Sequence, residues 1–171
     1  MEGMGQPVAN ELEQSQAKYA DGYYQDKLKQ GQEFEDFVGA VLYKVGIVTM
    51  PFTSQVYQRT RGENMLGAEI KNDEKFRETG RLYIETAEKS HPDKPSYTPS
   101  GIAREDNTWL YIIGDRSTLW IFSKTMLRGL ACGMTDYMNV ETPTSRGWLL
   151  PLRDADRYAA KKIEPGEMHT P

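Results

Sequence analysis

Two short alternating segments in the middle of the chain each carry a glutamate and a lysine. Glu69 and Lys71 lie two positions apart in the first segment, and Glu85 and Lys89 lie four positions apart in the second. Carboxylate oxygens are the ligands that Mg²⁺ and Mn²⁺ prefer. A lysine beside them can neutralise the charge that develops on a phosphate. These residue types therefore suit metal-assisted hydrolysis of phosphodiester bonds.

The two segments, residues 67–72 and 81–87, alternate with period two and predict the strands of an antiparallel hairpin with a long loop. If the hairpin centre is near Arg77, Glu69 lies directly opposite Glu85. Carboxylates in that relation repel each other unless a cation neutralises them. Glutamates and lysines on the solvent face of a short hairpin are also common, so ordinary surface charges are the alternative.

A helix must precede these strands. Apolar residues recur at helical spacing over 32–45, at Phe34, Val38, Val41, Leu42 and Val45. In this helix Glu35 lies at the margin of the buried stripe, whereas Asp36 faces water.

The remaining pattern alternates between strands and helices. Residues 47–58 predict an edge strand, or a strand broken at Pro51. Further strands are predicted over 108–113, 118–122 and 145–152, helices over 124–129 and 153–162, and a long loop over 90–106. The fold class is then α/β, with a central mixed β-sheet flanked by helices. We expect three parts: a polar arm over 1–30, one domain over 31–163 and a short tail over 164–171.

The composition excludes several classes of protein. The single cysteine, Cys132, rules out an internal disulfide and a cysteine zinc site, and two histidines make histidine-based triads improbable. No run of residues approaches the length of a membrane span, and the first six residues lack a signal-peptide pattern. We therefore expect a cytoplasmic protein without a nucleotide cofactor, because neither a P-loop nor a dinucleotide fingerprint is present.

The charge balance is not that of a typical nucleic-acid binder. The net charge is −4, and the acidic excess falls in the first fifty residues. Three arginines could still bind a phosphate backbone, although a solvated surface is the simpler interpretation: Arg59, Arg61 and Arg146. The three tryptophans could stack on bases, but their strand-like context favours core packing: Trp109, Trp120 and Trp148.

The run GAEIKND…GRLYIETAEKS resembles the PD-(D/E)XK, or restriction-endonuclease-like, nucleases, and in particular small phage-type and bacterial nuclease-like proteins. The likeness covers roughly residues 31–125. It implies a restriction-endonuclease-like α/β fold and a metal-dependent endonuclease that hydrolyses DNA with Mg²⁺ or Mn²⁺. It further implies two partners, DNA and a second copy of the chain. A catalytically inactive binding module, or a nuclease for branched DNA or RNA, is the alternative.

Carried over residue by residue, the resemblance assigns Glu69 and Glu85 to the metal and Glu35 to the acidic position on the helix. The sequence departs from the motif at Ala87, where the family has lysine, so Lys71 or Lys89 would replace it. A rival alignment makes Glu69 and Lys71 the acid-x-lysine element. That alignment needs an acid on the preceding strand, and residues 47–58 contain none. The first alignment is therefore preferred.

Overall fold

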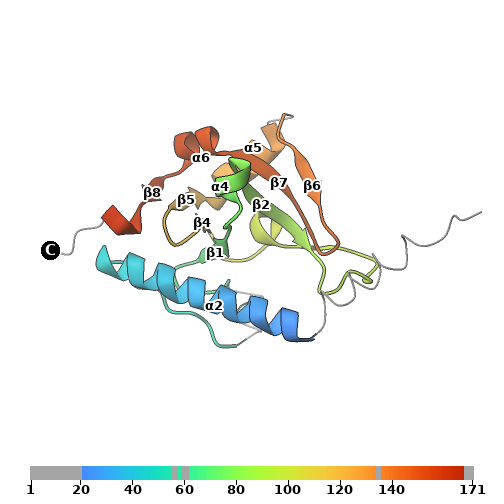
Figure 1. The fold of residues 1–171 in the computed structure, drawn as a ribbon, viewed down its shortest axis with the longest axis horizontal. Coiled ribbons are helices and arrows are strands. Elements are labelled where there is room, and N and C mark those ends of the chain that lie inside the picture. The colour runs from blue at the N-terminus through green and yellow to red at the C-terminus, as the bar shows by residue number, and fades with distance from the viewer. Residues whose placement is uncertain (1–20, 55–57, 59–61, 134–135, 168–171) are drawn as a thin grey trace, which may run out of the picture. The chain divides into compact units, whose positions relative to one another are not determined.

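The computed structural model describes residues 21–54, 58, 62–133 and 136–167, and residues 21–25 as backbone only (Figure 1). Contacts divide the chain into two compact units, Met1–Glu33 and Phe34–Pro171. In the first unit the described residues form the beginning of helix α2, Asp21–Lys44, and the described side chains from Asp26 to Glu33 are largely exposed.

The first sheet of the second unit is mixed. Its strand order is β1 (Ala68–Asn72), β4 (Leu110–Gly114), β5 (Leu119–Ser123) and β8 (Lys161–Ile163). Strands β1 and β4 are parallel, and the other pairs are antiparallel. Parallel neighbours need a crossover connection, and here the chain passes through a second sheet between β1 and β4. Because β1 stands first in the strand order, it is an edge strand of this sheet.

The second sheet is antiparallel throughout. Its order is β3 (Thr98–Pro99), β2 (Arg81–Glu88), β7 (Ser145–Pro151) and β6 (Asn139–Glu141). The short helix α4 (Phe76–Thr79) leads from β1 into β2, and the 3₁₀ turn η1 (Gly101–Ala103) follows β3. The pairing of β2 with β7 is irregular between Glu85 and Ala87.

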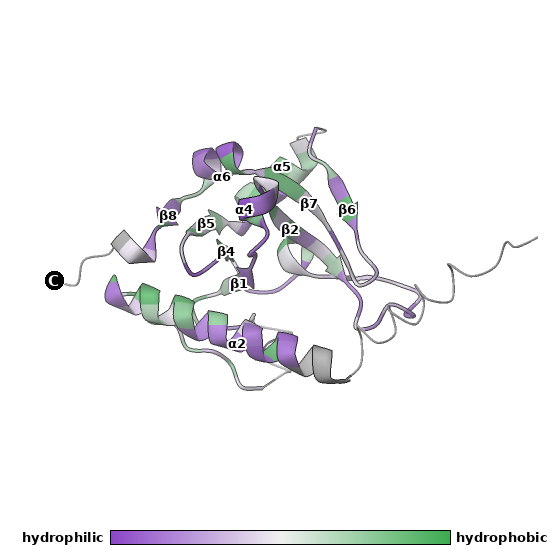
Figure 2. Ribbon diagram, in the orientation of Figure 1, coloured by the Kyte–Doolittle hydropathy of each residue, from purple (hydrophilic) through white to green (hydrophobic). Residues whose placement is uncertain are grey.

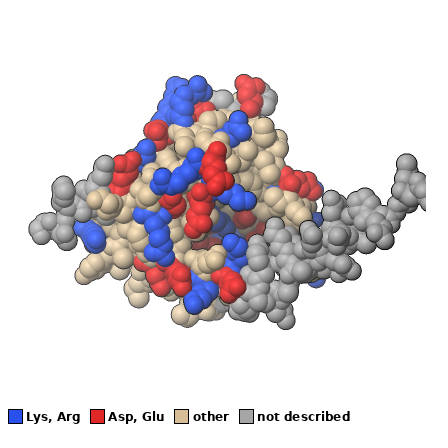
Figure 3. Space-filling view, in the orientation of Figure 1, with Lys and Arg blue, Asp and Glu red and all other residues tan. Residues whose placement is uncertain are grey.

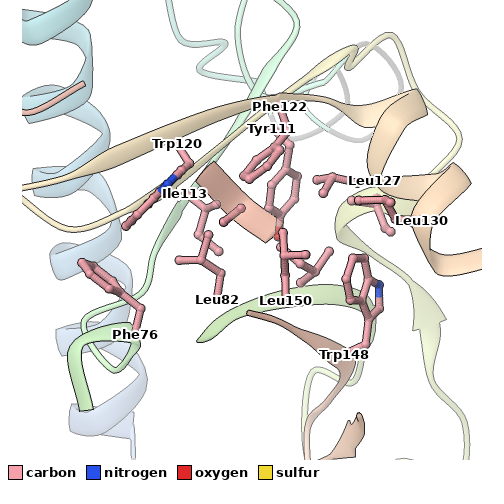
Figure 4. Packing of buried hydrophobic residues seen from close by; sticks show 13 residues of the cluster. Phe76, Leu82, Tyr111, Ile113, Trp120, Phe122, Leu127, Leu130, Trp148 and Leu150 are labelled. Carbon is pink, nitrogen blue, oxygen red and sulfur yellow. The ribbon is translucent and has the colours of Figure 1, made fainter. Parts of the chain in front are cut away.

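The core between the two sheets is made by side chains from both. Tyr111, Ile113 and Phe122 of the first sheet pack with Leu82 and Leu150 of the second (Figure 4). Helices α5 (Lys124–Gly133) and α6 (Leu152–Tyr158) add Leu127, Leu130 and Ala155 to this cluster. The 3₁₀ turn η2 (Pro165–Glu167) follows β8. Each fully buried leucine or isoleucine contributes about 1.5–3 kcal/mol to folding.

The other face of the first sheet is covered by helix α2. Phe34, Val38 and Leu42 pack with Ala68 and Ile70 of β1. Figure 2 shows the banding of hydrophobic and hydrophilic residues along α2 that this one-sided packing requires. The amphipathic helix predicted over 32–45 is thus confirmed, but the helix begins at Asp21, and Val45 is half exposed.

The predicted hairpin of residues 67–72 and 81–87 is wrong, although both strands exist. Strand β1 pairs with β4 and strand β2 pairs with β7, so Glu69 is not opposite Glu85 in any ladder. Alternation identifies the buried face of a strand but not its partner. Here α4 and Gly80, with a φ of 66°, turn the chain from one sheet into the other.

Two other predictions also need correction. Residues 47–58 contain no regular strand among those described, because Pro51 lacks an N–H and makes one isolated bridge, to Asn64. The structure has two sheets in place of one central sheet, and the second sheet covers the face of the first that lies opposite helix α2. The coarser α/β class holds. No helix in the described part of the chain is long and apolar enough to cross a membrane.

Candidate functional site

Strand β1 places an acid and a base between the two sheets. Ala68 and Ile70 point toward helix α2, so alternation turns Glu69 and Lys71 to the opposite face. Glu69 is fully buried, and it lies beside Tyr111 in the register of β1 and β4. A buried carboxylate is costly unless other charged or polar groups compensate it.

Lys71 joins carboxylates from both sheets. Its Nζ lies 3.0 Å from Glu69 Oε1 and 3.2 Å from Glu85 Oε1, and the lysine side chain is 30% exposed. Burial alone would lower the pKa of Lys71, but the two carboxylates outweigh it and raise the pKa well above its ordinary value. Lys71 is therefore charged at neutral pH. The approach of Glu69 and Glu85 comes from sheets packed face to face, not from strand pairing.

Glu85 is held by a lysine and two hydroxyl groups. Ser100 Oγ donates to Oε1 at 2.7 Å, and Ser145 Oγ donates to Oε2 at 3.1 Å. Burial alone would raise the pKa of Glu85, but Lys71 and these hydrogen bonds outweigh it and lower the pKa. Glu85 is therefore ionised and well satisfied as it stands.

Glu63 and Arg104 approach Glu69 from the other side. Arg104 Nη2 lies 3.5 Å from Glu63 Oε1 and 3.8 Å from Glu69 Oε2, and its Nε lies 2.6 Å from Asp106 Oδ2. Burial raises the pKa of Glu63. Asp106 also accepts from the buried Lys124 at 2.9 Å; burial opposes ionisation there, but Lys124 and Arg104 lower its pKa to about 2. This network anchors the guanidinium beside Glu69.

Glu35 completes the acidic group from helix α2. It is half-buried, as its marginal position predicts, and Asp36 is exposed. Burial, reinforced by the charge of Glu63 and opposed by Lys71, raises the pKa of Glu35 to about 7. Glu35 also lines a cavity of about 480 Å³ between α2, Pro51 and Ile70. Glu35 therefore exchanges its proton near neutral pH.

The carboxylate of Glu69 is ion-paired with Lys71, but it accepts no hydrogen bond. Although Lys71 Nζ and Arg104 Nη2 lie nearby, neither Glu69 oxygen has a hydrogen bond of acceptable geometry, and Arg104 Nη2 has none either. Buried polar groups are rarely left unpaired, and exceptions often mark a position for water or an ion. In the described part of the chain, no three carboxylate, imidazole or thiol groups lie together as ligands of one metal ion.

Other residues singled out from the sequence lie in different contacts. Lys89 places its Nζ 4.3 Å from the centre of the Tyr97 ring, and Arg146 stacks on the same ring while pairing with Glu141 at 3.0 Å. The structure thus engages Lys71, not Lys89, with Glu69 and Glu85. The two remaining arginines lie outside the described residues: Arg59 and Arg61.

Glu63 and Arg104 were missed from the sequence. The rival alignment expects its first acid on a strand over residues 47–58, whereas Glu63 lies after that segment. Instead Phe52 N donates to Glu63 O at 2.9 Å and Met65 N donates to Met50 O at 2.9 Å, so a short paired loop holds Glu63. The one feature of the sequence that indicates Glu63 is its position shortly before Glu69.

Charged residues of both signs are mixed on the face that Figure 3 draws. Figure 3 shows lysines and arginines interspersed with acidic residues on the face that it draws, in keeping with the net charge of −4. A phosphate backbone would therefore meet no broad basic area on that face.

Comparisons of the chain with protein-family models, with curated proteins and with solved structures found no match.

Proposed function

We propose that the chain is a metal-dependent endonuclease that hydrolyses DNA phosphodiester bonds at Glu69 and Lys71. One observation carries the proposal: a fully buried carboxylate has no hydrogen bond to either oxygen, although a lysine and an arginine lie beside it. A buried anion left in this state suits the binding of a cation. The adjacent basic groups suit a phosphate.

The donor set fits a hard cation. Mg²⁺ is usually held by one or two carboxylates, with waters and substrate phosphates completing its shell. Glu69 would hold the ion together with Glu63 or Glu85, and the absence of a three-ligand group among the described residues does not conflict with this arrangement. When bound, the ion would make a water molecule nucleophilic at neutral pH. Its positive charge, beside the phosphate, would also stabilise the negative charge of the reacting group.

The side chains have separate roles in this proposal. Lys71, charged at neutral pH, would contact the scissile phosphate and offset the negative charge that grows during hydrolysis. Arg104 is fixed by its ion pair with Asp106. Its guanidinium would either bind the phosphate backbone of the substrate or keep the Glu69 carboxylate in position. Glu35, with a pKa near 7, would take up or release a proton beside the site.

The geometry favours the rival alignment with the PD-(D/E)XK nucleases. Glu63 and Glu69 would be the two acids, Lys71 the motif lysine and Glu35 the acid on the helix. In this alignment the lysine stands two positions after its acid, so Ala87 is no longer a departure. Glu85 would then be an additional acid on the second sheet. The restriction-endonuclease-like fold is part of this proposal.

The test is nicking of supercoiled plasmid DNA. The wild-type protein should nick with Mg²⁺ or Mn²⁺ and not with EDTA, whereas Glu69→Gln and Lys71→Met should lose at least about a hundredfold in rate. Lys89→Met is the matched control and should retain its rate. Equal nicking by wild type and Glu69→Gln would eliminate the assignment.

A second candidate is a nuclease fold that binds nucleic acid without cutting it. The observation in its favour is that Lys71 pairs with Glu69 and Glu85 at the same time, which neutralises acids that a metal would otherwise occupy. Titration calorimetry with Mn²⁺ separates the two candidates, since only the nuclease binds the ion. Cleavage of duplex, four-way junction, single-stranded DNA and RNA would then identify the substrate.

A further inference from the structure

One tryptophan differs from the other two in its exposure. Trp120 and Trp148 are 2% and 3% exposed and pack in the core between the sheets, whereas Trp109, just before β4, is 58% exposed. The sequence context favoured core packing for all three, and this prediction is wrong for Trp109. Singly exposed hydrophobic side chains are common on protein surfaces, so the case for a function of Trp109 depends on its surroundings.

The exposed ring is fixed in position. Its indole Nε1 donates to Leu66 O at 2.8 Å, and its backbone N donates to Gly67 O at 2.8 Å. Gly67 has a φ of +71°, and a Cβ there would come within 2.7 Å of Trp109 Cδ1. The absence of a side chain at Gly67 therefore lets the indole lie against the backbone. A ring ordered in this way binds a flat partner at a low cost in conformational entropy.

A cavity of about 340 Å³ lies beside the ring. It is within the size range of small-molecule sites, about 300–1,000 Å³. Its walls combine aromatic, aliphatic and amide groups: Phe52, Asn64, Met65, Leu66, Gly67, Asn107 and Trp109. Among the described residues no charged side chain lines it, and these walls suit an uncharged planar group better than a phosphate.

The cavity adjoins the candidate site. Asn64 lines both this cavity and the larger one beside Glu35, and it follows Glu63 directly. Trp109 precedes Tyr111 by two residues, and Tyr111 is the register partner of Glu69. Two residues along a strand span about 7 Å. A nucleotide whose phosphate lay at Glu69 could therefore place a neighbouring base in the cavity.

We propose that this cavity binds an unpaired nucleobase, stacked on Trp109, of the strand whose backbone enters the Glu69 site. The inference rests on the proposed nuclease function and names its substrate class: nucleic acid with a single-stranded nucleotide next to the scissile bond. Aromatic side chains bind bases in this way without regard to sequence, because each base has a π-face.

The experiment measures binding without cleavage. A short fluorescein-labelled thymidine oligonucleotide and a fully paired duplex are titrated in EDTA with wild type, Trp109→Ala, Trp109→Phe and the control Met126→Ala, an exposed residue of α5. We expect Trp109→Ala to weaken single-strand binding about tenfold. Trp109→Phe and Met126→Ala should stay within about twofold, and duplex binding should not change. Wild-type tryptophan fluorescence should fall on single-strand binding, because the exposed indole stacks.

The outcomes separate the two proposals. Single-strand affinity unchanged by Trp109→Ala, or tryptophan fluorescence unchanged by the oligonucleotide, would overturn the base subsite even if the wild type nicks plasmid DNA. Trp109-dependent single-strand binding by a protein that nicks nothing would support the subsite and reject hydrolysis. A Trp109→Phe protein as weak as Trp109→Ala would also overturn stacking, since phenylalanine keeps an aromatic face.

Discussion

At the scale of residues, Lys71 is the member of the candidate site whose surroundings are best defined. Its ammonium lies between a fully buried carboxylate on β1 and a hydroxyl-bound carboxylate on β2. Removal of one partner from such a group leaves a buried charge without compensation, which usually costs more than the pair contributes. This asymmetry makes the lysine a sensitive probe of the site.

We predict that Lys71→Met lowers the free energy of unfolding by about 3 kcal/mol at pH 7, because Glu69 remains buried and loses its nearest cation. The double variant Lys71→Met/Glu69→Gln should recover part of this loss. Urea denaturation of the three proteins measures both values. Lys89→Met, whose ammonium lies over the Tyr97 ring, should change the stability by less than about 1 kcal/mol. Equal losses for both lysine variants would contradict this account.

The raised pKa of Glu35 predicts that the stability contributed at this position falls as the pH rises. A carboxylate in an ordinary ion pair shows the opposite dependence on pH. Its pKa is raised to about 7 in the folded protein from 4.5, so the folded state holds the proton that the unfolded state releases. The destabilisation is absent below about pH 4, grows through the interval up to pH 7 and is complete above it. Glu35→Gln should therefore stabilise the protein at pH 8, by about 1–2 kcal/mol for this partly exposed group, and not at pH 4.

Chemical denaturation in EDTA at the two pH values checks this prediction. The control is Asp36→Asn, which removes the neighbouring exposed carboxylate from the same turn of α2. A stabilisation by Glu35→Gln of the same size at pH 4 would show that packing, and not ionisation, is responsible.

Some residue positions could be predicted from the sequence because they follow from periodicity. Alternation placed Glu69 and Lys71 on one face, and the helical stripe placed Glu35 at its margin; both hold. Glu63 and Arg104 lie in irregular segments, where no period relates one side chain to the next. Their approach to Glu69 depends on tertiary contacts that a single sequence does not encode in a local pattern.

At the scale of elements, the position of Glu85 depends on the close packing of η1 against β2. Gly101 has a φ of +53°, and a Cβ there would overlap the carbonyl group of Glu85. The preceding residue, Ser100, donates to the Glu85 carboxylate. A residue without a side chain is therefore required where the turn meets the strand.

We predict that Gly101→Ala lowers the free energy of unfolding by at least about 2 kcal/mol, because the backbone is strained and β2 must move. If Glu85 assists hydrolysis, nicking should fall as well. Gly129→Ala in α5 is the matched control: a Cβ there would meet nothing within 4 Å, so the change should stabilise the protein by about 0.5–1 kcal/mol. Urea denaturation compares the two variants, and a neutral Gly101→Ala would show that the packing is less tight than described.

The strands of the site could be located from sequence, but their partners could not. The strand predicted over 67–72 is observed as Ala68–Asn72, and that over 81–87 as Arg81–Glu88. An antiparallel hairpin was the simplest connection. The alternative, two sheets packed face to face, depends on burying Leu82 and Ile84 against Tyr111, a contact between distant parts of the chain. Alternation gives the same signal in both arrangements.

At the scale of the whole molecule, the net charge of −4 works against binding to a polyanion. Acidic groups gathered around Glu69 would repel a phosphate unless a cation occupies the site. We predict that Ca²⁺, which binds oxygen ligands and usually does not support hydrolysis, raises the affinity for duplex DNA about tenfold over EDTA. Fluorescence anisotropy measures it, and Glu69→Gln should reduce the effect of Ca²⁺. Identical affinities in Ca²⁺ and EDTA would contradict a cation-dependent interface.

The central claim is that the carboxylate of Glu69 binds a divalent cation next to Lys71. The most direct measurement is a crystal structure after a Mn²⁺ soak, with anomalous scattering recorded. We predict one anomalous peak in contact with Glu69 and with Glu63 or Glu85. A crystal soaked in excess Mn²⁺ that shows no peak there, with Lys71 still paired with both Glu69 and Glu85, would contradict this claim.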